Sequence, residues 1–268
     1  MQLVVGNSYA KILQASTQEE SFLREYLTFH SSNPQGKDTS HCLLSAARMF
    51  PAGLAARVVA SARERGMEVA VAPRKPTVAP LAVPRDGLWP HQVRALDAIW
   101  ERRRGIIQHA TGTGKATTIA ALVAEINAPV LVLVTSIKLM HEMYDRIKKV
   151  AEITPGRFGD SYKELKRPVI VATVNSAAKL PKQKIDSFVA VLGDEVHGSG
   201  GNTYLSVVLS CVNAEIRIGF SGTPLHRSDK KSIYTIGAFG DVIDKYMPAQ
   251  AASDGITAKA NLTMVPMH

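Results

Sequence analysis

The segment HATGTGKATTIAAL, residues 109–122, determines the expected fold. Gly112 and Gly114 let the backbone curl until successive N–H groups face one concavity, and the helix that follows adds the positive end of its dipole. A polyphosphate fits there, and Lys115 would reach its β- and γ-phosphates. Such a loop normally continues with Ser or Thr, whose hydroxyl binds magnesium, but this sequence has Ala116. The segment therefore predicts a triphosphate site that lacks one metal ligand.

Apolar strands and helical patterns alternate on both sides of this loop. The loop lies between a strand-like run, GIIQHA, and a helix that starts at Lys115; a second helical pattern covers Lys138 to Val150. Strands nearly continuous in Val, Ile and Leu indicate a parallel sheet buried on both faces. We therefore expect an α/β domain, with further strands at PVLVLVT, PVIVATV, SFVAVLGDE and IRIGFSG.

The first 72 residues show a different pattern. Short strand-like runs, QLVV, AKILQA, HCLLSA and MEVAVA, surround two helical patterns. One covers Thr17 to His30, opened by the capping-box pair Thr17 and Glu20, and the other covers Gly53 to Arg65. The four prolines of residues 73–87 indicate a linker. We expect a small α+β domain at 1–72, a linker at 73–87 and the α/β domain at 88–268.

Composition narrows the class of protein. The 268 residues are 46% hydrophobic, no apolar run approaches the length of a membrane span, and the first residues do not resemble a secretory signal. A cytoplasmic protein is expected. The net charge of +9 favours an anionic partner such as nucleic acid, although a solvated basic surface would give the same value. Cys42 and Cys211 form no metal or disulfide pattern, and we expect both to be buried thiols.

A pair of carboxylates lies about eighty residues after the loop. VAVLGDEVH, residues 189–197, is an apolar strand that ends at Asp194 and Glu195, and ligands bind at this end of the strands in open α/β sheets. Asp194 could order a magnesium ion and its waters while Glu195 polarises an attacking water. An isolated Asp-Glu pair would indicate only a solvated strand end, but together with the loop it predicts nucleotide hydrolysis.

A third element, GFSGTP at 219–224, follows another apolar strand. Ser221 and Thr223 could sense the γ-phosphate and transmit its state to a bound polymer. By composition alone the segment equally fits a turn.

Together these motifs resemble the DEAH/DExH-type helicases of superfamily two, with ATGTGK as motif I, DEVH as motif II and SGTP as motif III. The resemblance implies a RecA-like P-loop NTPase fold that uses ATP and Mg²⁺. It nominates Gln92, in LWPHQ, to read adenine, and His197 to link the ATP site to motif III. It implies a nucleotide cradle of Thr111, Gly112, Thr113, Gly114, Lys115, Ala116 and Thr117.

The resemblance also implies contacts with a nucleic-acid backbone. VTSIKLMHEM at 134–143 and VATVNSAAK at 171–179 are similar to two backbone-gripping motifs of the family. Such contacts should be independent of base sequence and sensitive to salt. The nominated residues are Thr135, Ser136, Lys138, Thr173, Asn175 and Lys179. The run Arg102 to Arg104 is instead expected to close a helix, and no role is assigned to His91 or His109.

Within the superfamily, the sequence is most similar to the phage UvsW-like helicases, which remodel branched DNA, while XPB-like and restriction-enzyme motors remain alternatives. A monomeric, DNA-dependent ATPase is implied. Two departures weaken the expected activity: Ala116 lacks the metal-binding oxygen, and no motif of a second RecA-like domain with its arginine finger is present. A nucleic-acid-binding protein with a degenerate ATPase core is therefore the alternative from another class.

Overall fold

The computed structural model describes residues 1–32, 38–72, 75–196, 201–223 and 232–258. In the first part of the chain the elements are β1 (Gln2–Val5), β2 (Tyr9–Gln14), α1 (Thr17–Tyr26), β3 (Thr28–Ser32), β4 (Asp38–Cys42), β5 (Met49–Pro51), the 3₁₀ turn η1 (Ala52–Leu54), α2 (Ala55–Glu64) and β6 (Ala70–Ala72).

The second part of the chain contains α3 (Pro90–Arg102), β7 (Arg104–His109), α4 (Lys115–Ile126), β8 (Val130–Val134), α5 (Ile137–Val150), β9 (Gly156–Gly159), β10 (Tyr162–Lys163), β11 (Val169–Thr173), α6 (Val174–Ala177), α7 (Lys182–Ser187), β12 (Ala190–Gly193), α8 (Gly201–Ser210), β13 (Ile216–Ser221), α9 (Ser232–Phe239), β14 (Val242–Tyr246) and α10 (Pro248–Ser253).

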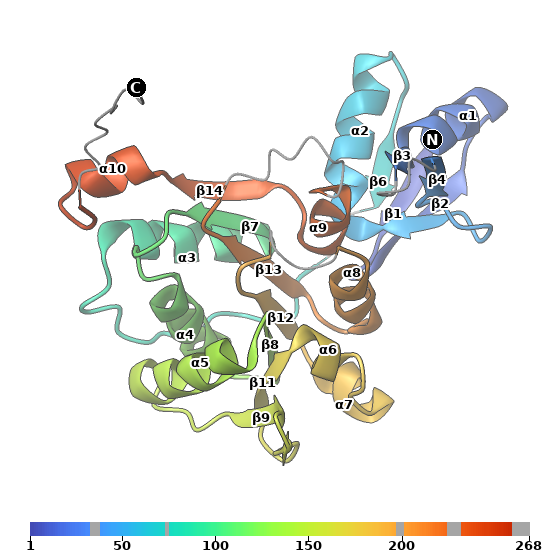
Figure 1. Cartoon of the computed structure of the whole chain (residues 1–268). Coiled ribbons are helices and arrows are strands. Elements are labelled where there is room, and N and C mark those ends of the chain that lie inside the picture. The colour runs from blue at the N-terminus through green and yellow to red at the C-terminus, as the bar shows by residue number, and fades with distance from the viewer. Residues whose placement is uncertain (33–37, 73–74, 197–200, 224–231, 259–268) are drawn as a thin grey trace, which may run out of the picture.

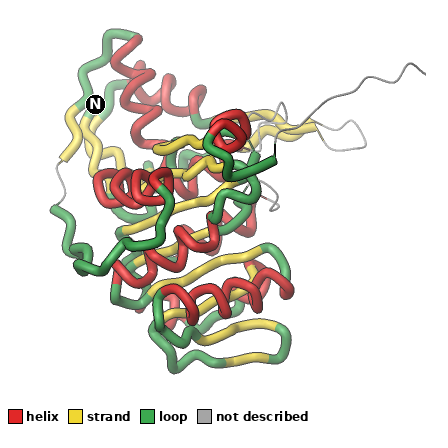
Figure 2. Tube along the Cα trace, turned by 90° about the vertical axis from the view of Figure 1, so that its left-hand side faces the viewer, coloured by secondary structure: helices red, strands yellow, loops and turns green. Residues whose placement is uncertain are grey.

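An eight-stranded sheet organises this second part, in the order β10-β9-β11-β8-β12-β13-β7-β14. Every pairing is parallel except that of the short edge strand β10 with β9. Helices α3, α4 and α5 cover one face, and α6 to α9 lie on the other (Figure 1). Seen from the α3–α5 side, the strands follow one another behind the helices (Figure 2). The predicted α/β fold with a parallel sheet is confirmed.

The alternation of side chains along each strand explains why the sheet is buried on both faces. In β8, Val130, Val132 and Val134 belong to the core under α3, α4 and α5. Leu131 and Leu133, between them, belong to the core on the opposite face. Because successive side chains of a strand point to opposite faces, only a strand that is apolar at every position suits this middle layer.

The first part of the chain forms a four-stranded sheet, β5-β2-β1-β6, and a two-stranded hairpin, β3-β4. Leu3, Ile12, Phe22 and Phe50 are among the residues of its own apolar core. Ile236 of α9 belongs to the same core, so residues from both parts of the chain share one set of contacts. The predicted division into domains at 1–72 and 88–268 stays a prediction.

Three local predictions for the first part are wrong. The first helix ends at Tyr26, not His30, because Thr28–Ser32 pair with β4 as a strand. Its capping box is formed by Ser16 and Glu19, one residue before the predicted pair Thr17 and Glu20. In HCLLSA, only the first two residues belong to a strand.

The prediction for the cysteines is half wrong. Cys211 is buried, whereas Cys42 is exposed. Cys42 is the last residue of β4, in a hairpin outside both larger sheets. A strand in that position is not enclosed between two layers, so its end remains in contact with solvent.

Residues 75–87 contain no helix or strand, but they are held against the α/β part. The backbone N–H of Leu81 donates to the carbonyl of Glu125 at 2.7 Å, and Arg85 forms ion pairs with Glu125 and Asp97. A proline-rich segment with fixed contacts of this kind restricts how the two parts of the chain can move.

Candidate nucleotide and nucleic-acid site

Five neighbouring parallel strands end at one edge of the large sheet. In the order β11, β8, β12, β13 and β7 they lead into Thr173, Thr135, Asp194, Gly222 and the loop from Ala110 to Gly114. The carboxyl ends of parallel strands share one edge, so chain segments as far apart in sequence as Ala110 and Gly222 become neighbours. The structure thus places the predicted nucleotide residues and the predicted nucleic-acid residues along one continuous edge.

The loop conformation depends on two glycines and on buried partners. Gly112 and Gly114 have φ of 85° and 75°, in the left-handed region that glycine adopts without strain. Inside the turn, the Thr113 hydroxyl donates to the carbonyl of Ala110 at 2.7 Å. Residue 114 ends the turn and α4 begins at Lys115, so the loop delivers its N–H groups to the positive end of a helix.

Gln92 lies under this loop. Its side chain is 3% exposed, and its amide nitrogen donates to the carbonyls of Thr113 and Gly114 at 3.3 and 3.2 Å. Its amide oxygen accepts the N–H of Trp89 at 2.9 Å. The side chain therefore holds the loop in place, and its predicted contact with adenine stays a prediction.

Lys115 joins the loop to the acidic strand end. Its side chain is 8% exposed, and Nζ lies 3.3 Å from Oε1 of Glu195. The same nitrogen donates to the carbonyl of His109 at 3.4 Å. Glu195 also accepts the N–H of Gly222 through Oε2 at 3.4 Å. One carboxylate therefore contacts both the phosphate loop and the end of β13.

The segment after β13 approaches the loop closely. A Cβ atom at Gly222 would lie 2.9 Å from Oγ1 of Thr111 and 3.1 Å from Nζ of Lys115. The hydroxyl of Ser221 donates to the carbonyl of Thr223 at 2.9 Å. The structure therefore brings Ser221 and Thr223, the predicted coupling residues, beside the nucleotide loop. His197, predicted for the same link, lies outside the described residues.

Asp194 is the most deeply placed acid of the site. It is 7% exposed, and its Oδ1 accepts the N–H of Glu195 at 3.1 Å. Burial, and next the charge of Glu195, raise the pKa of the Asp194 carboxyl to about 6. The hydroxyl of Tyr204 donates to the Asp194 carbonyl at 3.3 Å and fixes the strand end. A buried carboxylate so placed gains from a cation beside it.

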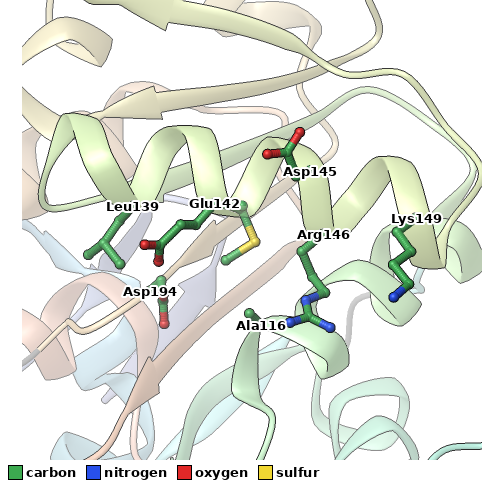
Figure 3. Close-up of a pocket in the computed structure, with 8 residues that line it drawn as sticks. Ala116, Leu139, Glu142, Asp145, Arg146, Lys149 and Asp194 are labelled. Carbon is green, nitrogen blue, oxygen red and sulfur yellow. The ribbon is translucent and has the colours of Figure 1, made fainter.

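A cavity of about 390 Å³ opens between Asp194 and the first turn of α4 (Figure 3). Residues from α5 form its other wall. The lining residues are Ala116, Leu139, Glu142, Met143, Asp145, Arg146, Lys149 and Asp194. Ala116, at the position where the related loops carry a hydroxyl, thus lines this cavity and also packs against the core under α3, α4 and α5.

The residues at this cavity fit a magnesium ion that arrives with a nucleotide. No three His, Cys, Asp or Glu side chains of the described residues come together as a metal cluster. Magnesium needs no such cluster, because one or two carboxylates, waters and phosphate oxygens usually complete its shell. Asp194 supplies one carboxylate, and the hydroxyl that Ala116 lacks would have been a further ligand.

The predicted nucleic-acid residues lie at the other half of the edge. Ser136 caps α5 by accepting the N–H of Leu139, and Thr173 caps α6 by accepting the N–H of Ser176. Because β8 and β11 are adjacent, with Val134 opposite Thr173, the two helix N-termini open on the same side. Thr135, Ser136, Lys138, Asn175 and Lys179 are exposed.

Sequence reasoning missed a group of side chains behind the loop. Nε2 of His91 donates to the carbonyl of Thr113 at 2.9 Å, and the ring stacks on Tyr246 with ring centroids 4.1 Å apart. His109 pairs with Asp244 at 2.6 Å, and Arg94 pairs with the same carboxylate at 2.7 Å. Asp244 and Tyr246 belong to β14, and nothing in the local sequence shows that this strand pairs with β7.

Comparisons with known proteins show the family of the chain. The family model described as "Type III restriction enzyme, res subunit" matches residues 86–226, more than half of the chain. The chain is 29% identical over 157 residues to the DNA 3'-5' translocase XPB2 of Sulfurisphaera tokodaii, covering 59% of this chain and 35% of that protein. It is 24% identical over 185 residues to the ATP-dependent DNA helicase uvsW of Enterobacteria phage T4, covering 63% and 36%.

The fold agrees with a solved structure over most of the chain. The crystal structure of the UvsW helicase from bacteriophage T4 superposes with a TM-score of 0.77 and 19% identity, covering 91% of this chain and 100% of that one. The chain spans about a third of the length of the two curated relatives. Within the described part of the chain, the helices are too short or too polar for a membrane crossing.

Proposed function

Because this chain belongs to the family described as type III restriction enzyme, res subunit, we propose that it is the ATP-binding part of a DNA helicase or translocase of superfamily two. The contact between Lys115 and Glu195, 3.3 Å apart at one sheet edge, carries the proposal. A phosphate-binding lysine and a carboxylate able to act on water are needed together in nucleotide hydrolysis, and here they are already adjacent.

We propose that a bound triphosphate takes Lys115 away from Glu195. The phosphates would accept the lysine, and Glu195 would then be released to polarise the attacking water. Asp194 would hold a Mg²⁺ ion, and this ion would neutralise part of the negative charge on the phosphate oxygens. The Gly222 N–H contact with Glu195 supports a role for Ser221 and Thr223 in reporting this change to the nucleic-acid edge.

We further propose that the nucleic-acid partner is DNA and that branched DNA is preferred, as in phage recombination, replication or repair. The relatives named above support DNA, while the preference for branches rests on the likeness to UvsW alone. A monomer acting in the cytoplasm of a host cell, and a DNA-contacting accessory role for residues 1–72, belong to the same proposal.

The first prediction tests the nucleotide site. Lys115→Ala should weaken binding of a fluorescent ATP analogue by at least about tenfold, because the phosphates lose the positive charge of the lysine that binds them. Fluorescence titration with Mg²⁺ present measures this, and Lys138→Ala, exposed at the other half of the edge, is the matched control. If the wild-type chain binds no nucleotide, the ATPase assignment is wrong.

The second prediction concerns DNA. The affinity for forked DNA should fall steeply with salt, because each phosphate contact releases counterions. Replacing Lys138 and Lys179 together should lower the slope of log affinity against log salt by about two. Fluorescence anisotropy across a salt series measures both. A salt-independent affinity would contradict binding to the DNA backbone.

One observation favours a second function. Ala116 removes a metal ligand from the phosphate loop, as expected for a nucleic-acid-binding protein with a degenerate ATPase core. The family description likewise leaves a restriction-system motor open. An assay of DNA-stimulated phosphate release distinguishes the degenerate ATPase core from a working ATPase. DNA binding without any phosphate release would favour the degenerate core.

A further inference from the structure

The cavity beside Ala116 offers a way to hold the metal without the missing hydroxyl. Ala116 occupies the first turn of α4, and α5 passes over it on the far side of the cavity (Figure 3). Methyl-for-hydroxyl replacement alone would leave a small gap. The observed cavity of about 390 Å³ is much larger than such a gap. A water molecule takes up roughly 30 Å³ in the liquid, so the cavity has room for several waters. It can hold a cation together with its waters.

One side of the cavity carries a buried acid, and one of its carboxylate oxygens has no hydrogen bond to the described residues. Asp194 is 7% exposed, and the one hydrogen bond that its side chain makes to the described residues uses Oδ1. The buried ammonium group of Lys115 pairs with Glu195 rather than with Asp194. A carboxylate that is more than nine-tenths buried and lies at the wall of a cavity is the group to which a cation would bind.

Glu142 approaches this acid from α5. Its side chain extends from the helix toward Asp194 in Figure 3, whereas the carboxylate of Asp145, which also lines the cavity, points away from Asp194. The ion pair of Glu142 with Lys138, at 3.8 Å between two exposed side chains, is weak. The carboxylate of Glu142 is therefore available to the cavity.

We propose that Glu142 replaces the absent hydroxyl at position 116, by binding the water shell of the divalent cation that accompanies the nucleotide. Magnesium loses its waters reluctantly and usually keeps several of them, so a carboxylate too far for direct coordination can still fix the ion. Glu142 is thus a positioning residue. This inference rests on the proposed function, since the cation arrives with a bound triphosphate.

The test compares E142Q with D145N, an isosteric change on the same helix and the same cavity. The affinity for a fluorescent ATP analogue is measured with Mg²⁺ and with EDTA, and the ratio gives the contribution of the metal. We expect E142Q to lower this ratio about tenfold, as for other outer-shell partners of metals. D145N should leave it unchanged. Equal ratios in E142Q and the wild type would overturn the proposal.

A second variant tests the replacement itself. Ala116→Thr restores the family hydroxyl, so the double variant A116T/E142Q should recover the ratio that E142Q loses. Bound Mn²⁺, counted by electron paramagnetic resonance in the presence of a non-hydrolysable ATP analogue, gives a readout independent of turnover. Failure of A116T to rescue would show that Glu142 does not act in the place of this hydroxyl.

The failure of this inference can be distinguished from failure of the proposed function. If the wild type binds the analogue equally well in Mg²⁺ and EDTA, and Arg146→Ala abolishes that binding, the guanidinium beside Ala116 has replaced the metal and the inference is wrong. Nucleotide binding would then still stand. If no variant binds nucleotide under any condition, the proposed function fails first.

Discussion

At the scale of single residues, Gly114 decides whether the phosphate loop can form. Its φ of 75° is accessible to glycine at no cost, and the amide of Gln92 packs directly against its Cα. A side chain at this position therefore meets two separate obstacles: an unfavourable backbone conformation and a collision with a buried, hydrogen-bonded amide.

The third prediction separates these obstacles. Gly87 has a φ of 78°, and a Cβ atom there would have no neighbour within 4 Å among the described residues. Gly87→Ala should therefore cost only the left-handed conformation, about 1 kcal/mol. Gly114→Ala should cost clearly more and should also weaken ATP binding, because Gln92 must move. Urea unfolding and nucleotide titration of both variants measure this. Equal costs would mean that the Gln92 contact contributes nothing.

Sequence alone could predict the glycine turn before α4, because its backbone shape depends on neighbouring residues. The role of Gln92 could not be obtained in this way. Its contacts with Thr113 and Gly114 connect residues 21 and 22 positions apart, and no local pattern shows that the amide is buried. The space beside Ala116 depends in the same way on how α5 lies over α4.

At the scale of secondary-structure elements, β14 is the support of the loop. It pairs with β7 in parallel, and the carbonyl of Tyr246 accepts the N–H of Ala110 at 2.9 Å. Through Tyr246 it also stacks on His91, whose ring contacts the carbonyl of Thr113. The strand therefore fixes the start of the loop and, through a histidine, its middle.

The fourth prediction follows from the burial of His91. Burial lowers the pKa of the His91 imidazole, with His109 and Arg94 adding to the effect and the Thr113 carbonyl and Asp244 opposing it. The unfolded chain takes up this proton near pH 6.5 and the folded chain only at lower pH. The free energy of unfolding should therefore fall as the pH drops below about 6.5.

Urea unfolding of the wild type and of His91→Phe between pH 5 and 8 tests this prediction. Phenylalanine keeps the stacking on Tyr246 but cannot be protonated, so the loss of stability at low pH should be smaller in the variant. The same pH dependence in both proteins would show that His91 does not cause it.

At the scale of the whole molecule, a buried arginine ties the two parts of the chain together. Arg217 of β13 is 0% exposed and donates to the carbonyls of Ala214, Val208 and Cys211 and to the hydroxyl of Ser8. Ser8 lies between β1 and β2. Arg57 of α2 forms an ion pair with Asp241, next to β14. The small sheet is therefore packed on the eight-stranded sheet over several contacts.

The fifth prediction is that Arg217→Met destabilises the whole chain. The methionine fills the space but leaves buried acceptors without donors, at about 1–3 kcal/mol each, so a loss of at least about 3 kcal/mol is expected. Arg102→Met, whose side chain is 64% exposed, is the control and should change stability by less than about 0.5 kcal/mol. Urea unfolding measures both. A small effect of Arg217→Met would mean that water replaces the guanidinium.

The sequence by itself determined the glycine turn before α4, the acidic strand end, and the strands that alternate with helices, because each is encoded in neighbouring residues by backbone shape or by burial on two faces. Tertiary structure alone decided the order of the strands, the pairing of β14 with β7, the contact of Ile236 with the core of the small sheet, and the approach of Glu142 to Asp194. All of these features depend on contacts between residues that are far apart in the sequence. The sequence around a buried residue does not show which distant residue it contacts.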